Sequence, residues 1–306
     1  MSVPGTRLPG ELVVAVVVTR HRDELLRQSL ASVAGQSRPV DTVVVVDNGA
    51  SPDTAAVVAA CAVPTVYLPS HANLGGAGGF ALGLLTALSL GADWVWCADD
   101  DGRPEGPEVL ATLLEEARAR DLAEVSPAVV DESDPGRLAF PLRRGLRWRT
   151  AVGDFGREEF LPSYASLFNG ALFRADAFRS IGVPDLRLFI RGDETEIHRR
   201  LLRSGLRFGT TMRVRYLHPQ GGDEFLPILG GRLSAQYPPD EVKRFYVYRN
   251  RGYLMAQPGM RWLFPLELVR FGWFFLSRGD VRGLRTWLSL TRAGRRERFA
   301  VPGSGS

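Results

Sequence analysis

The sequence has little cysteine, one lysine and no hydrophobic run long enough to cross a bilayer. Its two cysteines, Cys61 and Cys97, lie in apolar stretches, so no disulfide framework is predicted and a reducing compartment is expected. The most apolar segment, 80–90, is shorter than the roughly 20 apolar residues that a transmembrane helix needs. Residues 1–10 have no apolar core of the signal-peptide kind and are expected to be disordered. These absences favour a protein of the cytoplasm.

The charge of the chain is unevenly distributed. The 306 residues are 45% hydrophobic and 24% charged, as in an ordinary globular protein. The net charge is +4, and arginine supplies nearly all of the positive charge. Segment 261–306 contains nine arginines and three acidic residues, so the preceding residues are close to neutral. A basic C-terminal part indicates contact with nucleic acid or anionic lipid.

Short β-branched runs alternate with segments of helical periodicity in the first 120 residues. Continuous apolar runs are typical of strands that are buried on both faces of a parallel sheet. The predicted strands are 12–18, 43–46, 65–68 and 94–97, and the predicted helices are 23–34, one that opens at Ser51-Pro52-Asp53, 79–90 and 107–118. Four such repeats predict an α/β fold with a doubly wound, mostly parallel sheet.

The pattern becomes irregular after residue 123. Segment 137–152 is expected to form a loop or hairpin, and 207–217 alternates like an edge strand. The last part is expected to consist of helices at 242–256, 262–276 and 281–293, followed by a flexible end at 301–306. The expected organisation is a catalytic domain at 11–235 and a helical extension at 236–300.

Polar or glycine-rich residues follow each of the four predicted strands. In an open parallel sheet, ligands bind beyond the carboxyl ends of the strands. The residues expected there are Thr19, Arg20, Asp47, Asn73, Gly75, Gly76, Asp99, Asp100 and Asp101. An Asp47-Asn48-Gly49 turn or a helix entry at Asn73 needs no ligand, so each signal alone is weak. Four of them on one edge indicate a binding site.

The triplet Asp99-Asp100-Asp101 is the most informative of these features. Adjacent carboxylates repel one another, and oxygen ligands suit Mg²⁺ or Mn²⁺, which bridge proteins to diphosphates. An acidic turn before Gly102 and Pro104 is the alternative. His218, which precedes Pro219, could complete such a metal site or could be structural.

Two further motifs have competing interpretations. Residues 76–81 match G-x-G-x-x-A, as in dinucleotide-binding folds, but they follow two earlier strand–helix units and do not follow their strand directly. A nicotinamide enzyme is therefore disfavoured. Asp193 and Glu194 open a predicted helix, where acidic residues are favourable in any case, or one of them is a general base for a hydroxyl nucleophile.

The order of these motifs resembles that of family 2 glycosyltransferases with the A-type fold over about residues 11–235. Segments "NLGGAGGF", "ADDDG", "FIRGDETE" and "VYRNRGY" are similar to the actinobacterial galactofuranosyltransferases that begin cell-wall galactan. The resemblance implies an inverting, metal-dependent transfer from UDP-galactofuranose to a polyprenyl-diphosphate-linked rhamnosyl-N-acetylglucosamine. The alternatives are a dTDP-rhamnose-dependent rhamnosyltransferase and an inactive nucleotide-sugar-binding scaffold.

The resemblance also implies roles for individual residues. Thr19, Arg20 and Asp47 would hold uridine, Asn73, Gly75 and Gly76 would line the donor site, and Asp99 to Asp101 would bind ribose and diphosphate. Asp99, Asp101 and His218 would be the ligands of Mn²⁺ or Mg²⁺. Glu194 falls where the family has its base, normally an aspartate, so Asp193 is retained beside it. Phe168, Asn169 and Gly170 are expected to bind the acceptor.

The C-terminal helices combine aromatic residues with arginine. Amphipathic helices of this composition lie in a bilayer interface. The protein is therefore expected either in the cytoplasm or bound peripherally to the inner membrane surface, at the cytoplasmic face of the plasma membrane. A helical cap on the sheet or a homo-oligomer contact would use the same residues. No nucleic acid partner is expected, because the basic residues are spread through apolar helices.

Overall fold

A computed structural model describes residues 11–144, 147–220 and 224–302. They form two compact units. The first contains the described residues up to Pro184 together with Ile197–Gln220, and the second contains Asp185–Glu196 and the described residues after Gln220.

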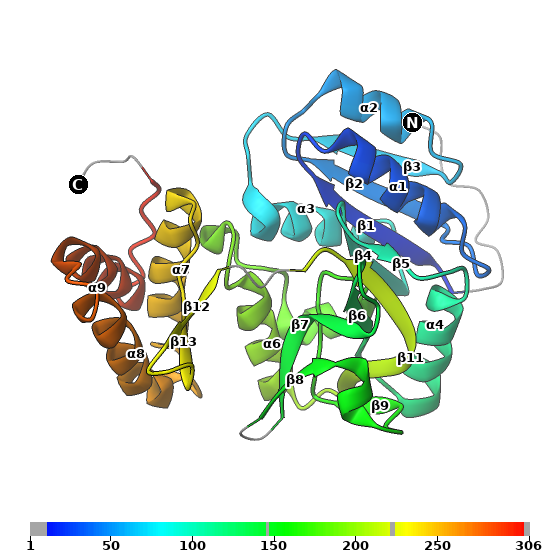
Figure 1. Cartoon of the computed structure of the whole chain (residues 1–306). Coiled ribbons are helices and arrows are strands. Elements are labelled where there is room, and N and C mark those ends of the chain that lie inside the picture. Colours follow the sequence, from blue (N-terminus) through cyan, green and yellow to red (C-terminus); the bar gives the residue numbers. More distant parts are fainter. Residues whose placement is uncertain (1–10, 145–146, 221–223, 303–306) are drawn as a thin grey trace. The chain divides into compact units, whose positions relative to one another are not determined.

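The first unit begins with the predicted alternation of strands and helices (Figure 1). Its parallel strands lie side by side in the order β3-β2-β1-β4. Their bounds are β1 Val13–Thr19, β2 Thr42–Asp47, β3 Thr65–Pro69 and β4 Trp94–Asp99, and the helices are α1 Asp23–Ala34, α2 Pro52–Ala59, α3 Gly75–Ser89 and α4 Val109–Arg120. The four predicted strand–helix repeats are confirmed.

β1 is buried along its whole length because helices cover both faces of the sheet. Val13, Ala15 and Val17 pack in one core cluster with residues of α1 and α4, and the alternate valines pack in a second cluster with α3. α3 approaches the sheet closely through two glycines. A Cβ at Gly79 would lie 2.6 Å from Val18, and one at Gly83 would lie 2.4 Å from Val16. This close packing explains part of the glycine run without a dinucleotide.

The second half of the sheet is mixed. β10 (Leu172–Arg174) runs antiparallel between β4 and β6 (Glu124–Asp131), and β11 (Phe208–His218) runs parallel to β6. β7 (Arg137–Arg144) and β8 (Arg147–Ala151) form the hairpin expected at 137–152. The remaining elements of this unit are β5 Arg103–Pro104, β9 Phe160–Pro162, α5 Phe178–Ile181, and the 3₁₀ turns η1 Val152–Phe155 and η2 Ala175–Ala177.

Two strands of this half differ from the sequence-based expectation. The prediction of an edge strand at 207–217 is wrong, because β11 pairs with β6 on one side and with the short strands β5 and β9 on the other. The arginines that alternate along β11 do not require an exposed edge. One of them, Arg213, donates hydrogen bonds to Glu115 and Glu116 of α4. β6 was not expected at all, because Glu124 and Ser126 interrupt its apolar pattern. Both residues are fully buried, and the Ser126 hydroxyl donates a hydrogen bond to the Glu124 carboxyl group.

The second unit contains the predicted C-terminal helices and a hairpin (Figure 1). Its elements are η3 Leu186–Leu188, β12 Phe225–Ile228, β13 Leu233–Gln236, α7 Glu241–Leu254, η4 Arg261–Leu263, α8 Phe264–Leu276 and α9 Val281–Arg295. α6 (Asp193–Ser204) begins in this unit and continues in the first. α7, α8 and α9 share an aromatic core that includes Tyr248, Phe271 and Trp287. No helix among the described residues is both long and apolar enough to cross a membrane.

Candidate active site

The residues predicted at the strand ends lie along one edge of the sheet in the first unit. Thr19, the last residue of β1, is in register with Asp47 of β2, and Val18 is in register with Asp99 of β4. Because these strands are adjacent and parallel, their carboxyl ends and the loops that follow meet at this edge. The structure therefore brings together Thr19, Asp47 and the aspartate triplet.

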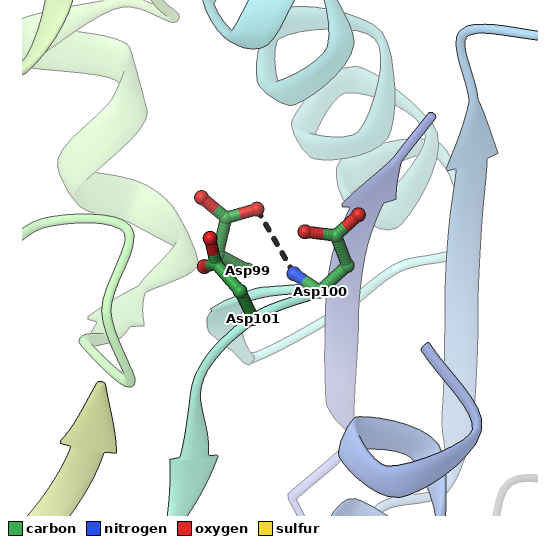
Figure 2. A group of neighbouring side chains, drawn as sticks. All are labelled: Asp99, Asp100 and Asp101. Carbon is green, nitrogen blue, oxygen red and sulfur yellow. Dashed lines mark hydrogen bonds between the residues drawn. The ribbon is translucent and has the colours of Figure 1, made fainter. Parts of the chain in front are cut away.

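The three aspartates at the end of β4 have two different environments. One ligand oxygen of each lies within 4.8 Å of the others. Figure 2 shows the Asp99 and Asp101 carboxylates close together and the Asp100 side chain on the other side, toward β1. Asp100 is buried, and its oxygens accept hydrogen bonds from Thr19 Oγ1 at 2.9 Å and from Arg22 Nη1 at 3.0 Å. Both oxygens of Asp100 thus accept from side chains, whereas Asp99 accepts from Asp100 N and Asp101 accepts from Arg22 through one oxygen each, and we take Asp99 and Asp101 as the candidate ligands.

Burial and mutual repulsion perturb the titration of the triplet. Burial, with the Asp101 and Asp100 carboxylates added to it, raises the pKa of Asp99 to about 8. Burial also acts to raise the pKa of Asp101, but His218 and Arg22 outweigh it and the pKa lies below its usual value. The raised pKa indicates that Arg22 and His218 do not fully compensate a negative charge on Asp99, and a bound cation would compensate it.

His218 has the geometry of a metal ligand. Its Nδ1 lies 2.7 Å from the carbonyl oxygen of Pro219, and because a carbonyl only accepts, this contact assigns the ring proton to Nδ1. In the neutral ring the Nε2 lone pair then faces Asp101 Oδ1, 3.2 Å away. That oxygen is buried, and a protonated ring would form an ion pair with it. Two lone pairs that face each other need a proton or a metal ion between them. The donor set of carboxylate oxygen and imidazole nitrogen fits Mn²⁺ or Mg²⁺.

Tyr216 of β11 packs against Gly102, the residue that follows the triplet. Its ring lies between Gly102 and Gly170, where a Cβ would come within 2.4 Å and 2.5 Å of the ring. Gly170 has φ +81°, donates its N–H to Cys97 O, and accepts from Trp96 Nε1. A side chain at either glycine would displace Tyr216, so both glycines fix the distance between β11 and β4.

The residues predicted to bind the acceptor lie beside β4. Phe168 is buried and stacks on Phe80 of α3, with ring centroids 4.1 Å apart, and Asn169 is 7% exposed. Gly170 is bound to β4 as described above. These contacts show how the segment is held, and its role in acceptor binding stays a prediction.

The predicted donor-binding residues next to β2 and α3 are tightly bound by the protein itself. Asp47 is fully buried, and its oxygens accept from Gly49 N, Ser51 N and Tyr67 OH, each at 2.8 Å. Asn73 Oδ1 accepts from Gly75 N at 3.0 Å, and Gly75 has φ +68°, a conformation that glycine adopts without strain. Gly76 follows in the first turn of α3. Arg20 is exposed after β1.

Two residues at this edge were missed by the sequence-based analysis. Arg22, just before α1, donates to Asp100 and also to Asp101 Oδ2 at 2.8 Å, so one guanidinium joins two acids of the triplet. Asn48 ties β2 to α3, because its amide donates to Gly75 O and accepts from Leu74 N. Arg22 lies two residues after Arg20 in the same loop, and only the coordinates distinguish which arginine faces the acids.

The acidic pair predicted to contain the base belongs to the second unit. Asp193 is the first residue of α6 and is buried, whereas Glu194 is exposed. Burial raises the pKa of Asp193 to about 6, although backbone N–H groups at the helix start oppose this. A carboxyl group with this pKa is well suited to accept a proton near neutral pH.

Comparison with known proteins gives a consistent result. Residues 14–182 match the sequence family "Glycosyl transferase family 2". The chain is 60% identical to "Galactofuranosyltransferase GlfT1" of Mycolicibacterium smegmatis, over 94% of this chain and 98% of that protein. It is 57% identical to the protein of the same name from Mycobacterium tuberculosis, over 97% and 99%.

Solved structures share the fold at low sequence identity. GalNAc-T7 with UDP, GalNAc and Mn²⁺ is 13% identical with a TM-score of 0.55, over 81% of this chain and 52% of that one. The mannosyltransferase PcManGT of Pyrobaculum calidifontis with GDP-Man and Mn²⁺ is 17% identical with a TM-score of 0.50, over 96% and 76%. The predicted A-type fold is confirmed. The chain belongs to glycosyl transferase family 2 and is a glycosyltransferase.

Proposed function

We propose that the protein transfers galactofuranose from UDP-galactofuranose to a rhamnosyl-N-acetylglucosaminyl-diphospho-polyprenol, the first step of cell-wall galactan synthesis. The observation that carries this proposal is the 60% identity to a galactofuranosyltransferase over nearly the whole of both chains. The intact acidic triplet and acidic pair argue against an inactive scaffold. We assign catalysis to a domain at 11–235 and the remaining helices to an extension at 236–300.

The donor is assigned to the carboxyl edge of the sheet. We assign Thr19, Arg20 and Asp47 to the uridine, and Asn73, Gly75 and Gly76 to the wall of the same pocket. Because both oxygens of Asp47 already accept hydrogen bonds from the chain, it acts by holding the loop that surrounds the base. The positive φ of Gly75 supports a close approach of backbone to the sugar.

The diphosphate is assigned to the acidic triplet. Asp99, Asp101 and His218 are the proposed ligands of Mn²⁺ or Mg²⁺, which when bound stabilises the charge of the leaving diphosphate. Asp100 is a positioning residue, because Thr19 and Arg22 hold its carboxylate. Arg22 also contacts Asp101 and so fixes the orientation of one proposed ligand.

The acceptor hydroxyl loses its proton to Asp193 or Glu194. One displacement at the anomeric carbon then inverts its configuration, because the nucleophile attacks from the face opposite the leaving UDP. The raised pKa of Asp193 supports this residue, and the position of the family base supports Glu194. Phe168, Asn169 and Gly170 are assigned to the acceptor side.

Product analysis tests the proposal directly. The full-length protein is incubated with Mn²⁺, a synthetic disaccharide lipid acceptor and either UDP-galactofuranose or dTDP-rhamnose. Addition of one or more galactofuranosyl residues from the UDP donor alone is the expected result. Transfer only from dTDP-rhamnose would identify a rhamnosyltransferase. Calorimetric binding of UDP with Mn²⁺, without any transfer, would favour the scaffold.

A lipid-linked acceptor implies that the transfer reaction takes place at a membrane surface. We propose peripheral binding at the cytoplasmic face of the plasma membrane, supported by the basic, aromatic-rich helices of the second unit. A homo-oligomer through the same helices is the alternative that the experiments below address.

A further inference from the structure

Helix α8 has apolar residues on two opposite faces. Phe271, Phe274 and Phe275 are buried in the core of the second unit. The opposite face presents Leu266 (38% exposed), Val269 (58%), Trp273 (50%) and Leu276 (64%), and Trp262 (72%) precedes them in η4 with the same spacing of three or four residues. We call these five residues the α8 stripe. A helix that is apolar on both faces is normally covered on both, so the stripe indicates a partner surface.

Two acidic residues lie in α8 and in the turn that follows it. Glu267, the acid within α8, is 2% exposed and accepts from Arg251 and Arg270. Asp280 caps α9 by accepting from Gly283 N. Both acids are therefore engaged inside the unit.

Arginines lie at both ends of the helix. Arg295 of α9 lies over the Phe264 ring at the start of α8, 3.9 Å from its centroid, and Arg278 lies over Phe274 at the end of α8, at 4.1 Å. The exposed arginines of α9 are Arg282, Arg285, Arg292 and Arg295. Positive charge thus lies at both ends of α8 and along α9.

We propose that the α8 stripe inserts into the interfacial layer of an anionic bilayer, with the arginines of α8 and α9 at the depth of the lipid phosphates. Tryptophan favours this interface because its ring is apolar and its N–H is polar, and arginine adds attraction to anionic headgroups. A symmetric contact between two copies would bring the same arginines together without exposed acids of α8 to balance them. The inference deepens the proposed function, which places the acceptor at a membrane, and identifies the element that docks.

Flotation with vesicles tests the proposal on the full chain. Wild type is expected to float with phosphatidylcholine–phosphatidylglycerol vesicles, and less with phosphatidylcholine alone or at high salt. Val269→Glu and Trp273→Ser should each reduce the vesicle partition constant by roughly tenfold, equal to about 1.4 kcal/mol. Trp148→Ser in β8 is the matched control, because Trp148 is 64% exposed and lies in the first unit. Both stripe positions face solvent, so the variants should keep the wild-type thermal midpoint.

Three outcomes would overturn the inference. The first is no flotation of wild type with anionic vesicles, and the second is an equal loss of binding in Trp148→Ser. The third is a stable dimer, measured by sedimentation velocity, that Val269→Glu dissociates while vesicle binding stays absent. Transfer to a water-soluble acceptor separates this inference from the proposed function. Flotation without any transfer would leave the docking inference standing and refute the proposed function. Transfer without flotation would support the proposed function and refute the docking inference.

Discussion

Replacement of Asp101 by asparagine is the most direct test of the metal-dependent site. The substitution keeps the size of the side chain and removes one negative charge from the proposed ligand set. The introduced amide retains an oxygen that can accept from Arg22, so the loop should keep its shape. Arg22 is 50% exposed, and an ion pair of that kind contributes about 1 kcal/mol or less to stability.

The expected loss in catalysis is much larger. A unit charge acts on another at about 4 Å with roughly 4 kcal/mol in the partly screened environment of a protein surface. A 100-fold loss in turnover corresponds to about 2.7 kcal/mol. Even after relaxation of the site, the lost attraction for a divalent cation exceeds that threshold. We therefore expect Asp101→Asn to lower turnover by more than 100-fold and to raise the Mn²⁺ concentration needed for half-maximal transfer.

The assay measures galactofuranosyl transfer over a Mn²⁺ titration, with the thermal midpoint recorded beside it. Asp176→Asn is the matched control, since Asp176 is an exposed carboxylate that pairs with Arg174 at the opposite edge of the sheet. The control should retain wild-type turnover. Near wild-type transfer by Asp101→Asn, at an unchanged Mn²⁺ requirement, would refute the assignment of the ion to the triplet.

The remaining predictions concern the base and the packing of each unit. Asp193→Asn and Glu194→Gln should differ sharply in turnover, and equal modest losses would mean that the base lies elsewhere. If Asp193 is the base, the rate rises with pH through about 6 as its carboxyl deprotonates, and a pH profile of Asp193→Asn lacks that limb. Gly83→Ala should lower the free energy of unfolding by about 1–3 kcal/mol, seen as a lower thermal midpoint, because its Cβ would lie 2.4 Å from a valine of β1. Gly272→Ala, with no atom near its Cβ, should instead stabilise α8 by up to about 1 kcal/mol, and a loss at both glycines would contradict the packing argument. Asn250→Leu should cost more than about 2 kcal/mol in a denaturant titration, because it strands buried carbonyl groups.

The parallel half of the sheet was predictable because its signals are local. β1 and β2 are mostly β-branched runs, and the acids at the end of β4 stand directly after its apolar residues. Adjacent parallel strands then place their ends together by geometry alone. The sequence therefore predicts which loops share an edge.

The other half was harder because distant residues decide it. β6 contains Glu124 and Ser126, which interrupt the apolar pattern typical of a buried strand. Only the structure shows that the two side chains form a hydrogen bond with each other. β11 looks like an edge strand because arginines alternate along it, but the acidic partners of Arg213 lie on α4 and that of Arg215 is Glu105, each about a hundred positions away. Arg22 and Arg20 are equivalent in the sequence, and only the coordinates show which of them contacts Asp100.

The segment that leads into the candidate base shows how buried polar residues can define a site. Arg249 and Asn250 lie in the middle of α7 and are almost fully buried, which is unusual for these residue types. Asn250 Nδ2 lies 2.7–2.9 Å from the carbonyl oxygens of residues 188, 190 and 191, and Arg249 donates to that of residue 187. This segment has positive φ at Phe189 and Arg191, so it cannot satisfy these carbonyls in a helix or strand of its own. The polar pair of α7 supplies the missing donors, and the start of α6 is fixed as a consequence. A substitution in α7 is therefore expected to act on the acidic pair through the backbone, although it touches no reacting atom.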